Sequence, residues 1–147
     1  MSKSHGFPGV RIGYVYSNNL NMIKEISESL PVWNFNSIAE YFLEIMLKYR
    51  NEFEKSIEKT ISDRLEFSNL LKKQDWIERV FNSESDFILV ETKPEIVELI
   101  NKLLQFHNIY IREISNKFKD GKTYFRFAVR TGHENKLVIE KISSLIN

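Results

Sequence analysis

The chain has 147 residues, of which 42% are hydrophobic and 28% charged, and its formal net charge is +1. This is the composition of a globular protein with a sizeable core, and the near-neutral charge gives no electrostatic reason to expect nucleic acid or a membrane as a partner. The absence of cysteine excludes disulfides, thiolate metal sites and cysteine nucleophiles, and the three histidines, His5, His107 and His133, lack metal-ligand spacing. We expect a cytoplasmic protein, because the sequence has no apolar run that could cross a bilayer and no apolar signal region at its start.

The first half of the chain predicts one strand and two helical segments. Residues 10–18 (VRIGYVYSN) are rich in β-branched and aromatic residues, which favours a strand. A short helix is expected over residues 21–30, and Pro31 ends it. From a cap at Asn36 or Ser37 to about residue 73, apolar residues recur at three- and four-residue spacing. This helical pattern is unusually long, so we expect a kink or an element that spans two structural units.

The second half alternates strand and helix patterns. Strands are expected at residues 86–91 (DFILVE), 108–114 (NIYIREI) and 123–130 (TYFRFAVR), with an Asp-Gly turn before the last. Helices are expected at residues 94–107, with Pro94 in the first turn, and at 133–146. The order helix, strand, helix, strand, strand, helix is typical of a small α/β or α+β sandwich.

The opening stretch combines residue types that suit a phosphorylated aldehyde. Lys3 lies between two serines, small and turn-forming residues follow it, and Arg11 comes eight residues later. Small residues let the backbone approach a ligand, a lysine amine can form a Schiff base, and an arginine fork can bind a phosphate. Pyridoxal phosphate (PLP) carries both an aldehyde and a phosphate. From these residues alone, a solvated lysine and a surface arginine at the start of a strand remain the alternative interpretation.

The run SKSHGFPGVRIGY resembles the lysine motif of the class I/II PLP-dependent aminotransferases of fold type I, especially the histidinol-phosphate aminotransferase subgroup. In that motif a serine precedes the Schiff-base lysine, and the phosphate-binding arginine follows the lysine by eight residues within Gly-x-Arg-x-Gly-Tyr. Ser2, Lys3 and Arg11 occupy these positions. The resemblance implies PLP as cofactor, Lys3 as the catalytic lysine, and Ser2, Lys3 and Arg11 as cofactor-binding residues.

The resemblance continues through PVWNFNSIAEYF, SESDFILVE, NIYIREI and YFRFAVRTGHEN. Arg126 falls at the position of the family's substrate-carboxylate arginine, and Arg112 at an arginine that helps to bind an anionic substrate group. The resemblance therefore implies that both bind substrate. Read from the strand pattern alone, each arginine could equally be a charge on the solvent face or the partner of a nearby glutamate.

The resemblance implies an α/β (α+β) fold that is the C-terminal portion of fold type I. Residues 1–35 would be the end of the large PLP-binding domain, 36–73 the long interdomain helix, and 74–147 the small C-terminal α/β domain. The family's glycine-rich phosphate loop and the aspartate that pairs with the pyridine nitrogen precede the lysine. We therefore expect the chain to be a C-terminal fragment that starts at the lysine motif.

The activity implied by the resemblance is transamination of an amino acid or amino-phosphate substrate, with a 2-oxo acid as second substrate, through a Lys3 Schiff base in a homodimer. Two alternatives stay open. A PLP-dependent decarboxylase of the threonine-phosphate type shares the same motifs, and a catalytically inactive remnant or assembly module would explain a chain without the cofactor-binding half.

Overall fold

The computed structural model describes residues 5–146. The chain divides into two compact units, Met1–Phe53 and Glu54–Asn147. In the described part of the chain, no helix is both long and apolar enough to cross a membrane.

The first unit contains a short 3-10 helix, η1 (Pro8–Val10), and the helices α1 (Leu20–Ser29) and α2 (Ser37–Lys48). An asparagine caps each α-helix at its N-terminus, as asparagine commonly does. The Asn19 side chain accepts a hydrogen bond from the Met22 N–H (3.1 Å), and the Asn36 side chain accepts one from the Ala39 N–H (2.8 Å). The predicted short helix and the predicted cap at Asn36 are confirmed.

The strand expected over residues 10–18 is wrong. The backbone from residue 11 to residue 17 is irregular, and Arg11 has a φ of 58°, in the left-handed region that interrupts a strand. A strand also needs a neighbour for its N–H and C=O groups, and none of the strand pairings in the described residues includes this segment. Its aromatic side chains are exposed, with Tyr14 at 85%.

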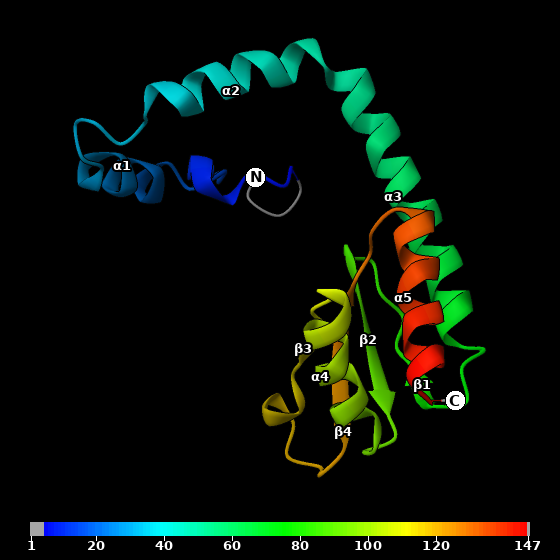
Figure 1. Ribbon diagram of the computed structural model, residues 1–147. Coiled ribbons are helices and arrows are strands. Elements are labelled where there is room, and N and C mark those ends of the chain that lie inside the picture. Colours follow the sequence, from blue (N-terminus) through cyan, green and yellow to red (C-terminus); the bar gives the residue numbers. More distant parts are fainter. Residues whose placement is uncertain (1–4, 147) are drawn as a thin grey trace. The chain divides into compact units, whose positions relative to one another are not determined.

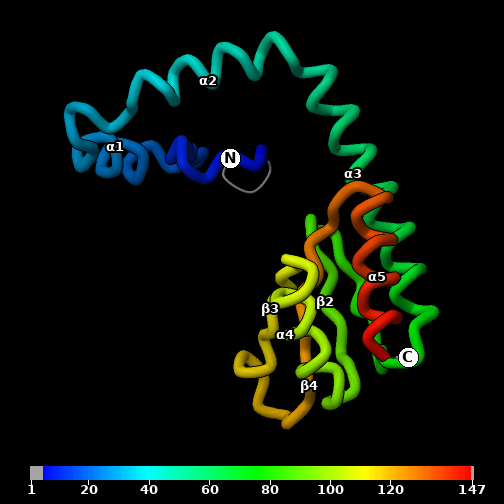
Figure 2. The backbone as a smooth tube through the Cα atoms, viewed as in Figure 1, coloured from blue at the N-terminus to red at the C-terminus, as the bar shows by residue number. Residues whose placement is uncertain are grey.

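Aromatic contacts join the start of the described chain to Phe42 and Phe53, and Figure 2 shows the backbone of this start below α2. The His5 ring stacks on the Phe53 ring with centroids 4.2 Å apart, and the Phe7 and Phe42 centroids are 4.6 Å apart. The Asn36 side-chain amide also donates to the Val10 carbonyl at 3.4 Å. The residues around η1 are therefore placed by contacts distant in sequence.

The long helical pattern is two helices that meet at Tyr49. Helix α2 ends there, and α3 (Arg50–Leu71) begins at the next residue. Tyr49 leaves the helical region at φ −108° and ψ 31°, yet its N–H still donates to the Ile45 carbonyl (3.1 Å) and its own carbonyl accepts from the Phe53 N–H (3.0 Å). The expected kink is confirmed, whereas the domain boundaries 1–35, 36–73 and 74–147 stay a prediction.

The second unit is built on an antiparallel sheet of strand order β1-β2-β4-β3 (Figure 1). The strands are β1 (Ile77–Val80), β2 (Phe87–Thr92), β3 (Arg112–Glu113) and β4 (Thr123–Ala128). Helix α4 (Ile96–His107) and η2 (Ser115–Lys117) lie between strands in the chain, and α5 (Gly132–Ile146) closes it. Two predicted strands and both predicted helices are confirmed, although Pro94 precedes α4. The strand expected over 108–114 shortens to Arg112–Glu113, and β1 was not predicted.

The core lies on one face of this sheet. Ile88 and Val90 of β2 and Phe125 and Phe127 of β4 are buried there, where buried side chains of α3, α4 and α5 join them in one cluster. Phe127 is central, because its ring lies 6.1 Å from Phe67 and 6.3 Å from Trp76 between centroids. The predicted α+β sandwich is confirmed for this unit. The alternation of the strands leaves the remaining side chains on the second face of the sheet.

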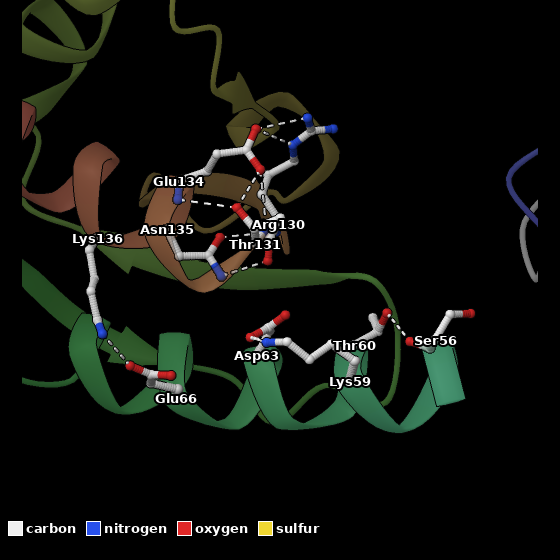
Figure 3. Close-up of polar contacts among 10 residues, drawn as sticks. All are labelled: Ser56, Lys59, Thr60, Asp63, Glu66, Arg130, Thr131, Glu134, Asn135 and Lys136. Atoms are coloured by element: carbon white, nitrogen blue, oxygen red, sulfur yellow. Dashed lines mark hydrogen bonds and ion pairs between the residues drawn. The ribbon is translucent and has the colours of Figure 1, made fainter. Parts of the chain in front are cut away.

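A polar network fixes the turn from β4 into α5 (Figure 3). Thr131 and Glu134 form a capping box: the Thr131 N–H and hydroxyl donate to the Glu134 carboxylate at 3.2 and 2.7 Å. The side chain of Asn135, only 2% exposed, accepts from the Arg130 N–H and donates to the Arg130 carbonyl, both at 2.9 Å. The chain that leaves β4 therefore has one defined path into α5.

Ion pairs near this turn involve α3, the helix that packs beside α5 in the core. In Figure 3, Lys136 of α5 reaches Glu66 of α3 at 2.8 Å, and Lys59 pairs with the buried carboxylate of Asp63. The hydrogen bond to Glu66 raises the pKa of Lys136 above its usual value. Helix α5 is thus tied to α3 by a polar contact as well as by the core.

Candidate functional site

The lysine motif lies at the start of the first unit. Ser2 and Lys3 fall outside the described residues, so their predicted roles stay predictions. His5 stacks on Phe53, which places it in a ring contact beside this motif. Gly6 follows at a φ of 68°, a left-handed conformation that favours glycine, and so makes the turn after the lysine.

Unlike Ser2 and Lys3, the third predicted site residue of this motif, Arg11, lies within the described residues. Its side chain is exposed, and one terminal nitrogen donates weakly to the Pro8 carbonyl at 3.4 Å. Across residues 5–146 no carboxylate forms an ion pair with it. An arginine that keeps its N–H donors free can bind an anion.

Arg11 also lines an open cavity of about 550 Å³ within the first unit. Residues after the motif, the inner face of α1 and the segment before α2 form the rest of the wall, including Gly13, Tyr14, Ile23 and Asn34. The wall is mostly apolar, with Arg11 as its cation. Such a mixture of apolar walls and one charged group is common in small-molecule sites.

The other two predicted site residues are brought together in the second unit. Arg112 of β3 and Arg126 of β4 are directly opposed Cα partners in the antiparallel pair. Directly opposed residues lie on the same face of a sheet, with Cβ atoms roughly 4.5–5.5 Å apart. The neighbours Ile111, Phe125 and Phe127 are buried in the core, so both arginines belong to the second face. Fourteen residues apart in sequence, they form one cationic position.

Neither arginine of this pair has a carboxylate partner among the described residues. The alternative interpretation from the strand pattern, that each arginine pairs with a nearby glutamate, is therefore not supported within the described residues. Arg126 is half-buried, and its guanidinium carbon lies 4.9 Å from the centroid of the Phe87 ring. Phe87 was missed at the sequence level, although its position in the alternation of DFILVE places it on the face opposite the buried Ile88 and Val90.

Other charged groups of this face have partners, or in the case of Arg79 lie opposite an acidic residue, Glu91. Lys122 binds Glu91 at 2.6 Å, and this bond raises the pKa of Lys122. The Tyr124 hydroxyl donates to the Asp120 carboxylate at 2.7 Å, which raises the pKa of Tyr124 to about 12 and lowers that of Asp120. Arg112 and Arg126 are therefore the two cations of the second face that lie directly opposite one another.

The chain is similar to a known protein family and to individual curated proteins. A model of the family described as "Aminotransferase class I and II" matches residues 1–142. The "Adenosylcobalamin biosynthesis bifunctional protein CobDQ" of Leptospira interrogans is 35% identical over 99% of this chain, which covers 17% of that protein.

Solved structures share the fold over nearly the whole chain. The histidinol-phosphate aminotransferase of Clostridium acetobutylicum is 27% identical with a TM-score of 0.85, over 97% of this chain and 42% of that one. The L-threonine-O-3-phosphate decarboxylase of Porphyromonas gingivalis is 27% identical with a TM-score of 0.82, over 99% of this chain and 44% of that one. The chain thus has the fold of the C-terminal part of these proteins and spans less than half of their length.

Proposed function

Because this chain belongs to the aminotransferase class I and II family, whose members are PLP-dependent enzymes, we propose that it supplies the catalytic lysine and anion-binding arginines for transamination of a phosphorylated amino compound. The observation that carries this proposal is the opposed pair Arg112 and Arg126, which has no carboxylate partner in the described residues. Like charges placed opposite one another destabilise a sheet. A bound anion would offset this repulsion, because both arginines would be attracted to it.

The substrate class follows from the charge of this pair and from the names of the similar proteins. Two guanidinium groups suit a dianion, and arginine is the residue best shaped for bidentate binding of phosphate. The two similar proteins named above are named for histidinol-phosphate and L-threonine-O-3-phosphate, and both compounds are small amines with a phosphate. We therefore assign a phosphorylated amine to this chain.

The residues of the lysine motif fit the cofactor. Arg11 is exposed and has no acidic partner in the described residues, so its guanidinium can bind the cofactor phosphate. Lys3 supplies an amine for the aldehyde, and Ser2 supplies a hydroxyl beside it. When bound, PLP acts as an electron sink for negative charge formed at the α-carbon of an amine.

The remaining steps belong to side chains of this chain. Lys3, in its neutral form, would take the proton from the α-carbon of the substrate. Arg126 would bind a carboxylate or an equivalent anion of the substrate, and Arg112 would share an anionic group with it. Because the arginines would hold the anionic end of the substrate, one bond of its α-carbon would point toward Lys3. This orientation would lower the activation barrier for proton transfer. A 2-oxo acid as second substrate and assembly as a homodimer are parts of the same proposal.

Decarboxylation is the second candidate. It is favoured by the similarity to the Porphyromonas gingivalis decarboxylase. That protein is 27% identical to this chain, the same sequence identity as the aminotransferase. The same lysine and arginines would serve both reactions. Transamination breaks the α C–H bond, whereas decarboxylation breaks the bond from the α-carbon to the carboxylate, so the products differ.

Covalent labelling tests the lysine assignment. The purified chain is incubated with PLP and reduced with borohydride, and the modified peptide is mapped by mass spectrometry. We expect stoichiometric labelling at Lys3, loss of the label in Lys3→Ala, and no change in Lys24→Ala, since Lys24 is an exposed lysine paired with Glu28. Labelling scattered over surface lysines would contradict the assignment.

Product analysis then separates the two reactions. The chain is supplied with PLP, O-phospho-L-threonine and 2-oxoglutarate, and glutamate and carbon dioxide are both measured. Glutamate supports the aminotransferase proposal, and carbon dioxide without glutamate supports the decarboxylase. Specific Lys3 labelling without either product would favour the third alternative, a remnant that retains the lysine motif without turnover.

A further inference from the structure

We propose that Phe87 is a positioning residue for Arg126: its ring stacks on the guanidinium and holds it in place with the N–H groups free for an anion. This inference rests on the proposed substrate-binding role of Arg126. It assigns a function to a residue for which the lysine and arginine motifs give none. The observation that carries it is the distance of 4.9 Å from the guanidinium carbon of Arg126 to the Phe87 ring centroid.

The strand register explains how the two side chains meet. Arg126 of β4 is opposed by Leu89 of β2, and Phe87 lies two residues from Leu89 on the same strand. Phe87 is therefore a diagonal neighbour of Arg126 on the second face, within reach of long and aromatic side chains. Phe87 is half-buried and cannot turn into the core, because its neighbour Ile88 fills that face. The backbone thus fixes the ring under the arginine.

The chemistry of the guanidinium explains why an aromatic ring suits this purpose. An arginine could be held in place by a carboxylate, but that contact would consume the in-plane N–H donors that a substrate anion needs. A ring below the guanidinium plane attracts the cation through its π-face and leaves the five in-plane N–H donors unused. No carboxylate pairs with Arg126 in the described residues, so the Phe87 ring is the contact that orients it.

The same sheet face contains a matched control. Arg79 of β1 lies over the Phe81 ring with its guanidinium carbon 4.6 Å from the centroid. Arg79, however, is the Cα partner of Glu91 and not of another arginine. Phe81 therefore provides an arginine–phenylalanine contact at a similar centroid distance that should have no part in anion binding.

The test measures binding of inorganic phosphate to the full chain by calorimetry, in the wild type and in Phe87→Leu, Phe87→Tyr, Phe81→Leu and Arg126→Gln. We expect Phe87→Leu to weaken binding roughly threefold to tenfold, the range given by a cation–π contact of ordinary strength. Phe87→Tyr, which keeps the ring, and Phe81→Leu should both bind like the wild type. Wild-type affinity in Phe87→Leu would overturn the positioning role.

Arg126→Gln separates this inference from the function on which it rests. If Arg126→Gln binds phosphate like the wild type, the substrate-binding role of Arg126 is wrong. If Arg126→Gln loses binding and Phe87→Leu does not, only the positioning inference is wrong.

A spectroscopic measurement keeps the test decisive if Phe87→Leu fails to fold. In chain labelled with ¹⁵N-arginine, the Nε–Hε resonance of Arg126 is assigned by its disappearance in Arg126→Gln. A guanidinium over an aromatic ring should show an upfield ring-current shift that persists in Phe87→Tyr. A wild-type resonance at the position of a solvated arginine would overturn the proposal.

Discussion

Arg112 and Arg126 face one another across the β3–β4 pair as direct Cα partners. Two cations in this position repel, and in the described residues neither finds a carboxylate. The Lys122–Glu91 pair on the same face shows that an acidic side chain can be accommodated there. The repulsion at Arg112 and Arg126 is therefore a cost that a phosphate-bearing ligand would remove.

Replacing Arg112 with Gln should stabilise the chain when no anion is present. The opposed charges are lost, so the free energy of unfolding should rise by roughly 0.2–1 kcal/mol. Added phosphate should stabilise the wild type by binding the folded state only, and it should stabilise Arg112→Gln much less. Urea unfolding with and without phosphate at constant ionic strength measures both effects.

Arg79→Gln is the control for that prediction, because Arg79 lies on the same face but opposite Glu91. Since no arginine lies opposite Arg79, its removal relieves no opposed arginine pair, and we expect no rise in the free energy of unfolding from this cause. Equal stabilisation by both substitutions would mean that general positive charge, and not the opposed arginine pair, sets the effect.

Asn135 should be worth more to stability than a surface asparagine. It is almost fully buried and pairs both the N–H and the carbonyl of Arg130. Asn135→Leu leaves two backbone groups without these partners, so the free energy of unfolding should fall by about 1–3 kcal/mol. Chemical denaturation provides the measurement, and Asn101→Ala on the exposed side of α4 should change the free energy far less. A small effect of Asn135→Leu would show that water replaces the side chain at this turn.

The sequence predicted the elements whose signals are local. Asn36 began a helix because its side chain accepts a hydrogen bond from the Ala39 N–H, and the β-branched and aromatic run at residues 123–130 contains strand β4. In both cases the pattern and its physical cause lie within a few residues of one another. A kink within residues 36–73 was expected from the length of the pattern, but no local signal placed it at Tyr49.

The elements that were wrong or missed depend on partners distant in sequence. VRIGYVYSN has the composition of a strand, but pairing decides whether such a segment becomes one, and no described strand lies beside it. Strand β1 was missed because Glu78 and Arg79 interrupt its apolar pattern and its register to β2 shifts between Ile77 and Arg79. The site shows the same limit: each arginine motif was found separately, whereas their opposition and the Phe87 contact follow from the register of β2, β3 and β4.

The two tryptophans should report the two units separately. Trp33 is 91% exposed in the first unit, whereas Trp76 is 6% exposed in the core of the second. Trp76→Phe, which leaves Trp33, should emit at the wavelength of a solvated indole and change little on heating. Trp33→Phe, which leaves Trp76, should emit at shorter wavelength and shift to the red in one cooperative transition. A blue-shifted, cooperative signal from Trp33 would mean that this surface is covered in solution.

Glu134 should make the stability of the chain depend on pH in acid. The Thr131 hydroxyl, then the Arg130 guanidinium and the Thr131 N–H, lower the pKa of this carboxyl to about 2. A glutamate in an unfolded chain has a pKa of about 4.3. Between these values the unfolded state binds more protons than the folded state, so stability rises with pH through this window. The stabilisation is complete above the unfolded pKa and is lost as pH falls toward the folded one.

Glu134→Gln should therefore melt at a lower temperature than the wild type at neutral pH, and the difference should shrink steadily below the unfolded pKa and be lost as the pH falls through about 2, the folded pKa. Thermal melts of both proteins across this range measure it. Glu28→Gln is the control, since Glu28 forms an exposed i, i+4 pair with Lys24, of a kind worth little to stability. Its melting temperature should follow the wild type at every pH. A difference between Glu134→Gln and the wild type that stayed constant into acid would mean that the carboxylate charge contributes nothing, and that the shape of the capping box alone holds the start of α5.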